Sequence, residues 1–388
     1  MILTGNKYYA MIVMLLLLVT ANRARASHIY GGDLLYTHIV GDQYKISLSL
    51  YGDCSGENAP YFPGSSPTIH LYQGASLMQT LTCTEDSSLR ENVSPVCAAF
   101  KAKTVCDDPL TTLPGAKRYV FSVVVTLPPS PNWRIVFEGR IDDDNGPLRN
   151  GTIAGRSGNI TNIFGAGTLV MQLEAKLDNS NGHNSSPYFT SVPTPYYCIN
   201  IPQQYNLGAV DDEKDSLAFT LVPGLVAGGG VAQYPSPYSA TAPLASVPGS
   251  FSYNNNSGQL NFTPNITQRS LVVIRVDEYR NGMLVGSSMR EMTFVVLPDC
   301  INKPPGGIVD SGTVIGGGVF NNEINVCLFE PLLKLSIQSN DPDGNNITAV
   351  VNNVPEGAVT KVNNNNSPNP VIDLSWDTED IPEGAYNM

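Results

Sequence analysis

The chain has 388 residues, with 22 basic and 34 acidic side chains and a formal net charge of −12 at neutral pH. A chain this acidic repels phosphate backbones, which argues against nucleic acid as a partner. Only 14% of the residues are charged, whereas 35 glycines, 29 prolines and recurrent asparagine strings favour turns and short strands over helices. The length is sufficient for two or three domains.

The first 26 residues have the pattern of a cleaved signal peptide. Lys7 gives a short positive start, an apolar run follows from 9 to 20, and the small residues of "ARA" at 24–26 match a signal-peptidase site. About 12 apolar residues are too few for a membrane-spanning helix, which needs about 20. We therefore expect cleavage after Ala26 and a secreted, extracellular or cell-surface protein.

A β-rich N-terminal domain is predicted for 27–180. Apolar and polar residues alternate in "YKISLSLYGDC", which places Tyr44, Ile46, Leu48 and Leu50 on one side of a half-buried strand. The same alternation predicts further strands in "KRYVFSVVVTL" (117–127), "NWRIVFEGRI" (132–141) and "GTLVMQLEAKL" (167–177). Long loops rich in glycine, proline and serine connect these strands.

A second domain is predicted for 184–300. Its entry is held extended by several prolines, and "DSLAFTLV" and "SGQLNFTP" are its first strands. In "SLVVIRVDEYRNGMLVGSSMREMTFVVLP", Asn281 and Gly282 supply the two positive φ angles of a type I′ turn, so two long strands form an antiparallel hairpin. Short strands with such turns predict a β-sandwich.

The remaining segment, 301–388, is predicted to be a linker followed by an incomplete second sandwich repeat. The linker is "NKPPGGIVDSGTVIGGG". Beyond it, "SNDPDGNNITAVVNNVPEG" partly repeats "GAVDDEKDSLAFTLVPG" of the second domain. Tandem similarity of this kind is typical of arrays. The fold class is therefore all-β, with tandem β-sandwich domains after a cleaved signal peptide.

Seven cysteines in an exported chain are more typical of disulfides than of metal ligands or nucleophiles. Four of them could form two bridges within the first domain, in any of three connectivities: Cys54, Cys83, Cys97 and Cys106. Cys198 and Cys300 bracket the second domain, so a bridge between its two ends is expected. Cys327 then has no partner within this sequence.

Several long phrases resemble the amino-terminal regions of large secreted Bacteroidota proteins known as gliding motility-associated. They are "SHIYGGDLLYTHIVGDQYKISLSLYGDCSG", "ITNI", "NSSPYFTSVPTPYYCINIPQQYNLGAVDDEKDSL" and "VVIRVDEYRNGMLVGSSMREMTFVVLPDC". The resemblance implies surface display and adhesion. It also implies association with the outer-membrane surface through a C-terminal domain, read by the type IX secretion system, that this sequence lacks.

Two shorter phrases, "SGQLNFTP" and "DPDG" followed by "NNITAVV", resemble cadherin-like and other immunoglobulin-like (Ig-like) repeats of bacterial adhesins. The sandwiches at 184–300 and 301–388 are therefore expected to be Ig-like or cadherin-like. One departure concerns "EGRIDDDNGPLRNG", which stands where the gliding-associated relatives often carry paired cysteines. A bridge at that place is not expected here.

Three acidic clusters could bind calcium, because a hard cation needs several closely spaced oxygen ligands. The candidates are Asp341, Asp343 and Asn345 in "DPDGN"; Asp211, Asp212, Glu213 and Asp215 in "DDEKD"; and Asp142, Asp143, Asp144 and Asn145 in "DDDNG". Alternatively, these side chains only make turns through hydrogen bonds to their own backbone. Calcium at a domain junction would stiffen the array.

Motifs for catalysis are missing from the sequence, which has only four histidines, no HExxH pair and no GxSxG. We therefore expect a non-enzymatic, adhesin-like or structural protein that binds an extracellular polysaccharide or protein. The alternative is a polysaccharide-binding or polysaccharide-degrading protein with a lectin-like or hydrolase N-terminal domain. Aromatic side chains could stack on sugars or fill the core, namely Tyr30, Tyr36, Tyr61, Phe62, Tyr72, Tyr196 and Tyr197.

Overall fold

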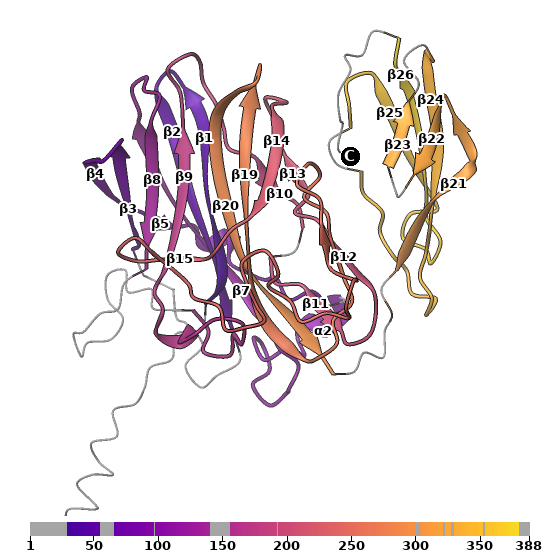
Figure 1. Ribbon diagram of the computed structural model, residues 1–388, viewed down its shortest axis with the longest axis horizontal. Coiled ribbons are helices and arrows are strands. Elements are labelled where there is room, and N and C mark those ends of the chain that lie inside the picture. Colours follow the sequence, from indigo (N-terminus) through magenta and orange to yellow (C-terminus); the bar gives the residue numbers. More distant parts are fainter. Residues whose placement is uncertain are drawn as a thin grey trace, which may run out of the picture.

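The computed structural model describes residues 29–54, 66–96, 98–139, 156–191, 193–298, 303, 305–320, 323–326, 330–351 and 354–379. The predicted signal peptide, the acidic cluster at 142–145 and Cys97, Cys300 and Cys327 lie outside these ranges. Within them the protein is all-β, as predicted, and its sheets are mainly antiparallel (Figure 1). No helix in these ranges is long and apolar enough to cross a membrane.

The short helical elements are α2 (Ala98–Lys101), η1 (Ser87–Leu89) and η2 (Ala166–Thr168). The large sheet runs in the order β4-β3-β8-β9-β20-β1-β2-β7-β5. Its first-half strands are β1 (Ile29–Val40), β2 (Gln43–Asp53), β3 (Thr68–Gln73), β4 (Ser76–Thr82), β5 (Thr84–Glu85), β6 (Glu91–Asn92), β7 (Ala116–Thr126), β8 (Trp133–Glu138) and β9 (Met171–Leu177).

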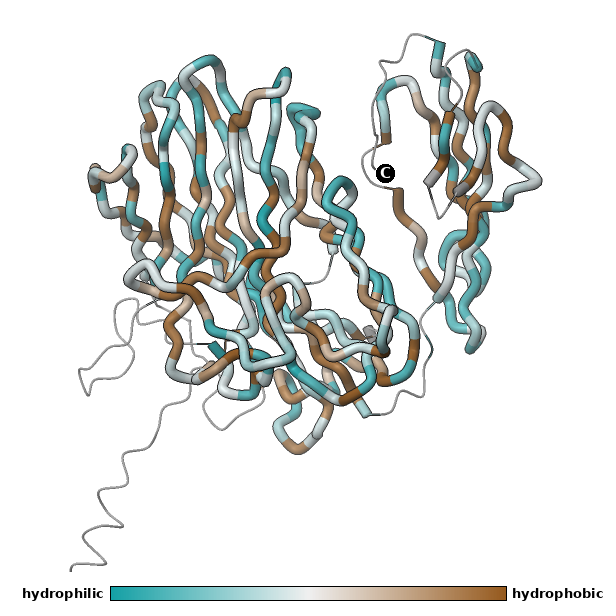
Figure 2. Tube along the Cα trace, viewed as in Figure 1, coloured by the Kyte–Doolittle hydropathy of each residue, from teal (hydrophilic) through white to brown (hydrophobic). Residues whose placement is uncertain are grey.

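The first hydrophobic core lies between β1, β2 and β7 on one side and β3, β8 and β9 on the other. The predicted alternation in β2 is confirmed, because Tyr44, Ile46, Leu48 and Leu50 are all fully buried in this core. Hydrophobic and hydrophilic stretches recur along the strands of this body in Figure 2. Two layers facing one core form a sandwich-type arrangement.

The predicted hairpin at 270–298 is confirmed. β19 (Gln268–Arg280) and β20 (Met283–Leu297) pair antiparallel along their length, from Gln268 opposite Val296 to Arg280 opposite Met283. Asn281 (φ 52°) and Gly282 (φ 77°) make the turn with the two positive φ angles expected.

This hairpin is buried on both faces. Leu271 and Val273 of β19 and Met289 of β20 belong to the first core. Val272 of β19 and Phe294 of β20, whose side chains point to the other face, belong to a second core. Successive side chains of a strand point to opposite faces, so the same two strands form a wall of both cores.

The second core is closed by the strands and loops of residues 189–262. They include β10 (Tyr188–Phe189), β11 (Tyr196–Cys198), β12 (Gln203–Tyr205), β13 (Ala209–Val210), β14 (Ser216–Leu221), β17 (Ser252–Tyr253) and β18 (Leu260–Phe262). In contrast, β15 (Leu225–Val226), which pairs with β9 and with β16 (Gly230–Val231), packs against the first core. Tyr197, Phe262 and Phe294 pack against one another at its centre, with ring centroids 4.9–6.0 Å apart.

The predicted division of the chain at 180–184 does not separate two bodies. One edge of β20 pairs with β9 at Gly286–Ser287, with β1 at Met289–Glu291 and with β11 at Val295–Leu297. Strands from both predicted domains therefore share one sheet. Alternation within a segment identifies a strand, but it carries no information about which distant strand pairs with it.

The third segment forms a four-stranded sheet, in the order β21-β24-β26-β25, and a separate two-stranded sheet, β22-β23, beside the main body in Figure 1. Its strands are β21 (Gly306–Ile315), β22 (Gly317–Phe320), β23 (Glu323–Val326), β24 (Leu332–Asn340), β25 (Ala358–Asn363) and β26 (Val371–Asp377). The predicted linker was wrong for 306–318, where β21 and β22 lie. Despite its glycines, β21 is held because it pairs with β24 and Val309 packs against the local core.

Two fully buried ion pairs fix β20 to the N-terminal half of the chain. Arg156 and Glu291 are 0% and 1% exposed, and Nε and Nη2 of the arginine lie 2.7 Å from Oε1 and Oε2 of the glutamate. Arg290, the residue before Glu291, donates to both carboxylate oxygens of Asp33 at 2.7 and 2.9 Å. Neither pair was predicted from the sequence.

We expect Glu291→Gln to lower the free energy of unfolding by about 3–5 kcal/mol, because it leaves the buried guanidinium of Arg156 without its counter-charge. Urea unfolding followed by tryptophan fluorescence measures this change. The matched control is Glu174→Gln, which breaks a partly exposed pair with Arg134 and should cost less than about 1 kcal/mol. Equal losses in the two variants would contradict the importance of the buried pair.

Candidate cation site in a buried carboxylate cluster

Three carboxyl groups meet near the turn end of the β19–β20 hairpin. Asp211 and Asp215 come from the turn between β13 and β14, and Glu278 comes from β19. One oxygen from each lies within 4.8 Å of the others. In the ranges that the structure describes, this is the sole group of at least three potential metal-ligating side chains.

The "DDEKD" turn positions the two aspartates. The backbone oxygen of Asp211 accepts from the Lys214 N–H at 3.3 Å, and its Oδ1 accepts from the Asp215 N–H at 2.8 Å. Lys214 adopts a positive φ of 62° to close the turn. Asp211 therefore forms a turn through its own side chain, as the alternative prediction proposed. The turn occupies only one of its two carboxylate oxygens. The other, Oδ2, is buried and has no hydrogen-bond partner.

Arg280 and Asn184 orient the remaining groups. Arg280 binds Asp215 with two hydrogen bonds of 2.8 and 2.6 Å and donates a third to the Asn184 side-chain oxygen at 2.8 Å. Asn184, fully buried, donates to Glu278 Oε2 at 2.6 Å and to the Tyr36 hydroxyl at 3.2 Å. Glu278 is fully buried too, and its Oε1 has no hydrogen-bond partner.

Gly286 makes room for this arrangement on the neighbouring strand. It lies opposite Glu278 in the hairpin. A Cβ atom at this position would lie 2.3 Å from the Tyr36 hydroxyl and 2.7 Å from Glu278 Oε1. Any larger residue would therefore collide with the cluster.

The protonation of the cluster follows from its burial. Desolvation raises the pKa of Glu278 to about 9, partly offset by the Asn184 hydrogen bond, and the carboxylates of Asp211, Asp215 and Glu213 add repulsion. Desolvation likewise raises the pKa of Asp211 to about 6. Excess negative charge in a buried site can be relieved by protons or by a divalent cation, for which carboxylate oxygens are suitable ligands.

The structure brings together only some of the calcium ligands predicted in "DDEKD". Asp211 and Asp215 come together as above, whereas Asp212 is exposed and lies outside the group. Glu278 was missed, although a glutamate in the apolar run "LVVIRVDEY" is a recognisable signal.

In the predicted cluster at 341–345, the aspartate oxygens accept hydrogen bonds from backbone N–H groups. Asp341 Oδ1 accepts from the backbone N–H groups of Asp343 and Asn345, both at 3.0 Å. Asp343 accepts from the backbone N–H of Lys303. These contacts are those of a turn stabilised by its own side chains.

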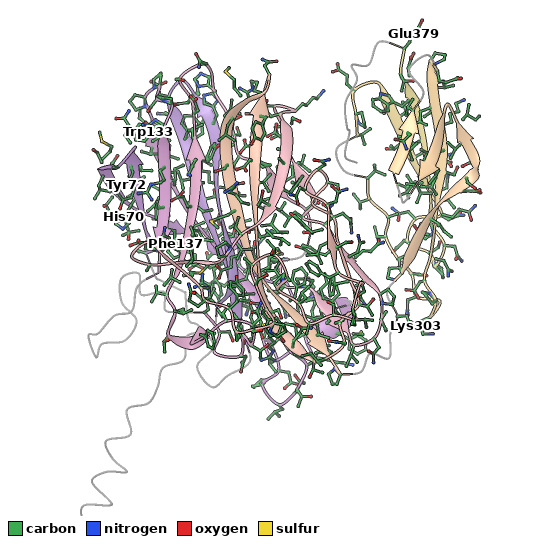
Figure 3. The ribbon with its side chains drawn as sticks, viewed as in Figure 1. His70, Tyr72, Trp133, Phe137, Lys303 and Glu379 are labelled. Carbon is green, nitrogen blue, oxygen red and sulfur yellow. A yellow bond between two sulfur atoms is a disulfide. The ribbon has the colours of Figure 1, made fainter. Side chains whose placement is uncertain are left out.

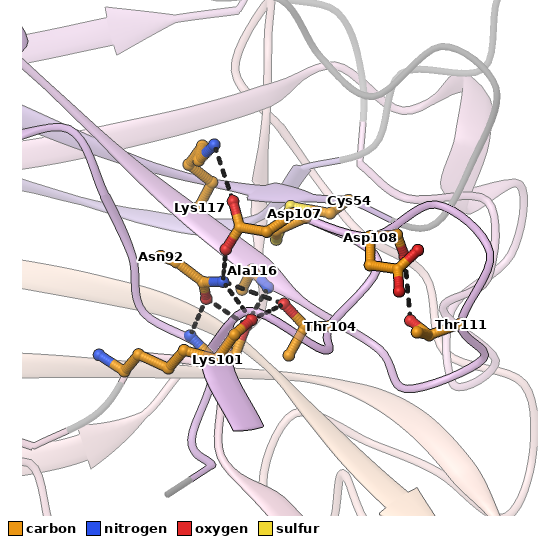
Figure 4. Close-up of a disulfide and its surroundings, with 11 residues drawn as sticks. Cys54, Asn92, Lys101, Thr104, Asp107, Asp108, Thr111, Ala116 and Lys117 are labelled. Atoms are coloured by element: carbon orange, nitrogen blue, oxygen red, sulfur yellow. Dashed lines mark hydrogen bonds and ion pairs between the residues drawn. A yellow bond between two sulfur atoms is a disulfide. The ribbon is translucent and has the colours of Figure 1, made fainter. Parts of the chain in front are cut away.

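The cysteines form fewer bridges in the first domain than expected. Cys54 and Cys106 are joined by a disulfide (Figure 4). Cys83 is a buried free thiol, and desolvation raises its pKa to about 12, so the expectation of a bridge at Cys83 was wrong. Its position on the core side between β4 and β5 explains this, because Cys83 packs as a small apolar residue. Cys198 is also disulfide-bonded.

The aromatic candidates divide between core and surface. Tyr30, Tyr36 and Tyr197 are buried, which agrees with a packing role. Tyr72 is partly exposed and lies on β3 with the Arg134 guanidinium 4.3 Å from its ring centre (Figure 3). Tyr196 is also half-buried, and Tyr61 and Phe62 lie outside the described ranges.

No protein-family model matches the chain, and no curated protein matches it. The family resemblance drawn from its sequence phrases therefore stays a prediction. The functional assignment depends on the chemistry of the residues themselves.

With a chelator present, we expect the free energy of unfolding to fall as the pH rises from about 4.5 to about 9. The folded state keeps the Glu278 proton over this window, whereas the unfolded chain, in which the glutamate has its ordinary pKa of about 4.5, has released it. The contribution of protonated Glu278 to the free energy of unfolding is therefore complete below pH 4.5. It decreases by at most about 1.4 kcal/mol per pH unit as the pH rises to 9.

Urea titrations between pH 5 and 9 test this dependence. Glu278→Gln should flatten the profile above about pH 6, because the amide cannot ionise and Asp211, whose pKa is raised to about 6, is already charged there. Asp212→Asn, at an exposed residue of the same turn, should leave the profile unchanged. A flat profile in the unmodified protein would show that Glu278 ionises normally.

Proposed function

We propose that the chain is a non-enzymatic secreted or cell-surface protein, adhesin-like or structural, that serves surface attachment and gliding motility. The observation that carries this proposal is the β19–β20 hairpin, which joins two hydrophobic cores into one sheet structure. Sheets fixed in this way present their loops and edges rigidly, which is how binding modules position their contacts. A rigid body of this kind suits display on a surface.

The disulfides support an oxidising location. Cys54–Cys106 closes a loop in the first half, and Cys198 is bonded as well. Disulfides persist outside the cytoplasm and are rare within it. The leader pattern at 1–26 and the phrases that resemble gliding motility-associated proteins point to the same compartment.

We further propose that Asp211, Asp215 and Glu278 bind a divalent cation, with calcium the best match. Three carboxylates and the single guanidinium of Arg280 leave two negative charges, which Ca²⁺ would neutralise. The buried oxygens without hydrogen-bond partners, Asp211 Oδ2 and Glu278 Oε1, are available as ligands. Binding would release the Glu278 proton, and so affinity would increase with pH.

The alternative is a polysaccharide-binding protein. A cavity beside β7, lined by cationic and apolar side chains, favours this second function. This alternative differs from the first proposal only in the ligand, and it assumes the same surface location.

Surface display is tested in a gliding Bacteroidota host that carries the gene. Proteinase K added to intact cells should degrade the protein while a periplasmic marker stays intact, and deletion of the gene should reduce attachment and colony spreading. Protection from the protease until the outer membrane is broken would contradict surface display. Unchanged attachment and spreading in the deletion strain would contradict the adhesive role.

Calcium binding is tested by differential scanning calorimetry at pH 7.5. Millimolar Ca²⁺ should raise the melting temperature by about 5 °C over EDTA, which corresponds to a ligand near 100 times its dissociation constant. Glu278→Gln and Asp211→Asn should abolish the rise, and Asp212→Asn should retain it. Equal melting temperatures in calcium and in EDTA would contradict the proposal that this cluster binds calcium.

A further inference from the structure

A cavity of about 360 Å³ lies between the β6–β7 region and the residues 189–191 and Pro193. Its lining combines cationic side chains, Lys101 and Arg118, with apolar ones such as Val96, Phe189 and Pro193. The volume is at the lower end of the range for small-molecule sites, about 300–1,000 Å³. Such a volume accommodates a small ligand and excludes a folded partner.

The wall formed by 189–191 is fixed to the interior by Arg290. The Nη1 of this arginine donates to the backbone oxygen of Ser191 at 3.0 Å and to its hydroxyl at 3.3 Å. The Arg290 guanidinium also lies 4.7 Å from the centre of the Phe189 ring. Because Arg290 is itself held by Asp33, this side of the cavity is preorganised.

The opposite wall is fixed by Asn92, which Figure 4 labels, and by Ser94. The Asn92 side-chain amide donates to the Lys101 backbone oxygen at 3.2 Å and to Thr104 Oγ1 at 3.0 Å. Ser94 accepts from the Ala116 N–H at 2.9 Å and donates to Asn92. The Cys54–Cys106 disulfide lies beside this network. The segment that carries Lys101 is thus held in place without a ligand.

The charges of the cavity match an anion. The Lys101 ammonium makes no ion pair within the described part of the chain. Arg118 pairs with Glu91 at 2.8 Å, but these side chains are 33% and 52% exposed. Exposed pairs of this kind contribute little, about 0–1 kcal/mol. A ligand carboxylate can therefore replace Glu91 on Arg118 at small cost and gain Lys101 as a second cation.

We propose that this cavity binds a hexuronic acid unit of an acidic polysaccharide. Arg118 and Lys101 would bind the carboxylate through charge-assisted hydrogen bonds, and Phe189 and Pro193 would pack against the C–H face of the sugar ring. The lining is mixed rather than apolar, which suits a hydroxylated ring. The inference is independent of where the protein is displayed.

The experiment is isothermal titration calorimetry of the chain from residue 27 with trigalacturonate, and with trigalactose as the neutral probe. We expect binding of trigalacturonate alone, weakened by 0.5 M NaCl. Arg118→Gln and Lys101→Gln should each weaken binding about tenfold. Glu91→Gln should strengthen it about threefold, because it removes the competing carboxylate.

The matched control is Lys103→Gln, which removes the same charge from an exposed lysine outside the cavity and should leave the affinity unchanged. Circular dichroism melting of each variant establishes that it is folded. Equal binding of trigalactose, equal loss in Lys103→Gln, or no binding of trigalacturonate at millimolar concentration would each overturn the proposal. A hexaglutamate peptide that binds more tightly than trigalacturonate would overturn the sugar assignment.

Discussion

Two adjacent charged residues of β20, Arg290 and Glu291, are the constraint on which the rest of the structure depends. Consecutive side chains of a strand point to opposite faces, so one charge enters each core. Arg290 meets Asp33 on one side and Glu291 meets Arg156 on the other. An unpaired charge in either core would be strongly unfavourable, and the partners must therefore be in place for β20 to be buried.

The sequence predicted local structure well. The alternation in β2, the Asn281–Gly282 turn and the all-β class depend on patterns within a few residues, and the structure agrees with each. Long-range pairing could not be predicted in the same way. Nothing in "MREM" indicates that Arg290 meets a residue near the start of the chain, or that three strands share one edge of β20.

The candidate sites likewise depend on long-range contacts that local sequence patterns do not predict. Asp211 and Asp215 share a turn that is recognisable as an acidic cluster, but Glu278 joins them only because β14 pairs with β19. The cavity near Arg118 combines residues from β2, β6, β7, β20 and 189–191, and no short motif contains them. The two sites have opposite charge preferences. Each includes a β1 residue in its support, Tyr36 at the cluster and Asp33 beneath the cavity.

The central position of β20 has a consequence for the order of folding. Asp33 and Arg290 are 257 residues apart in the chain, and the strand that completes both cores is among the last parts of the main body to be synthesised. Until about residue 297 has left the ribosome, neither core can close, and the earlier strands have exposed apolar faces. Chains dominated by such distant contacts fold slowly. The main body is therefore expected to complete its folding only after the β19–β20 hairpin has been synthesised.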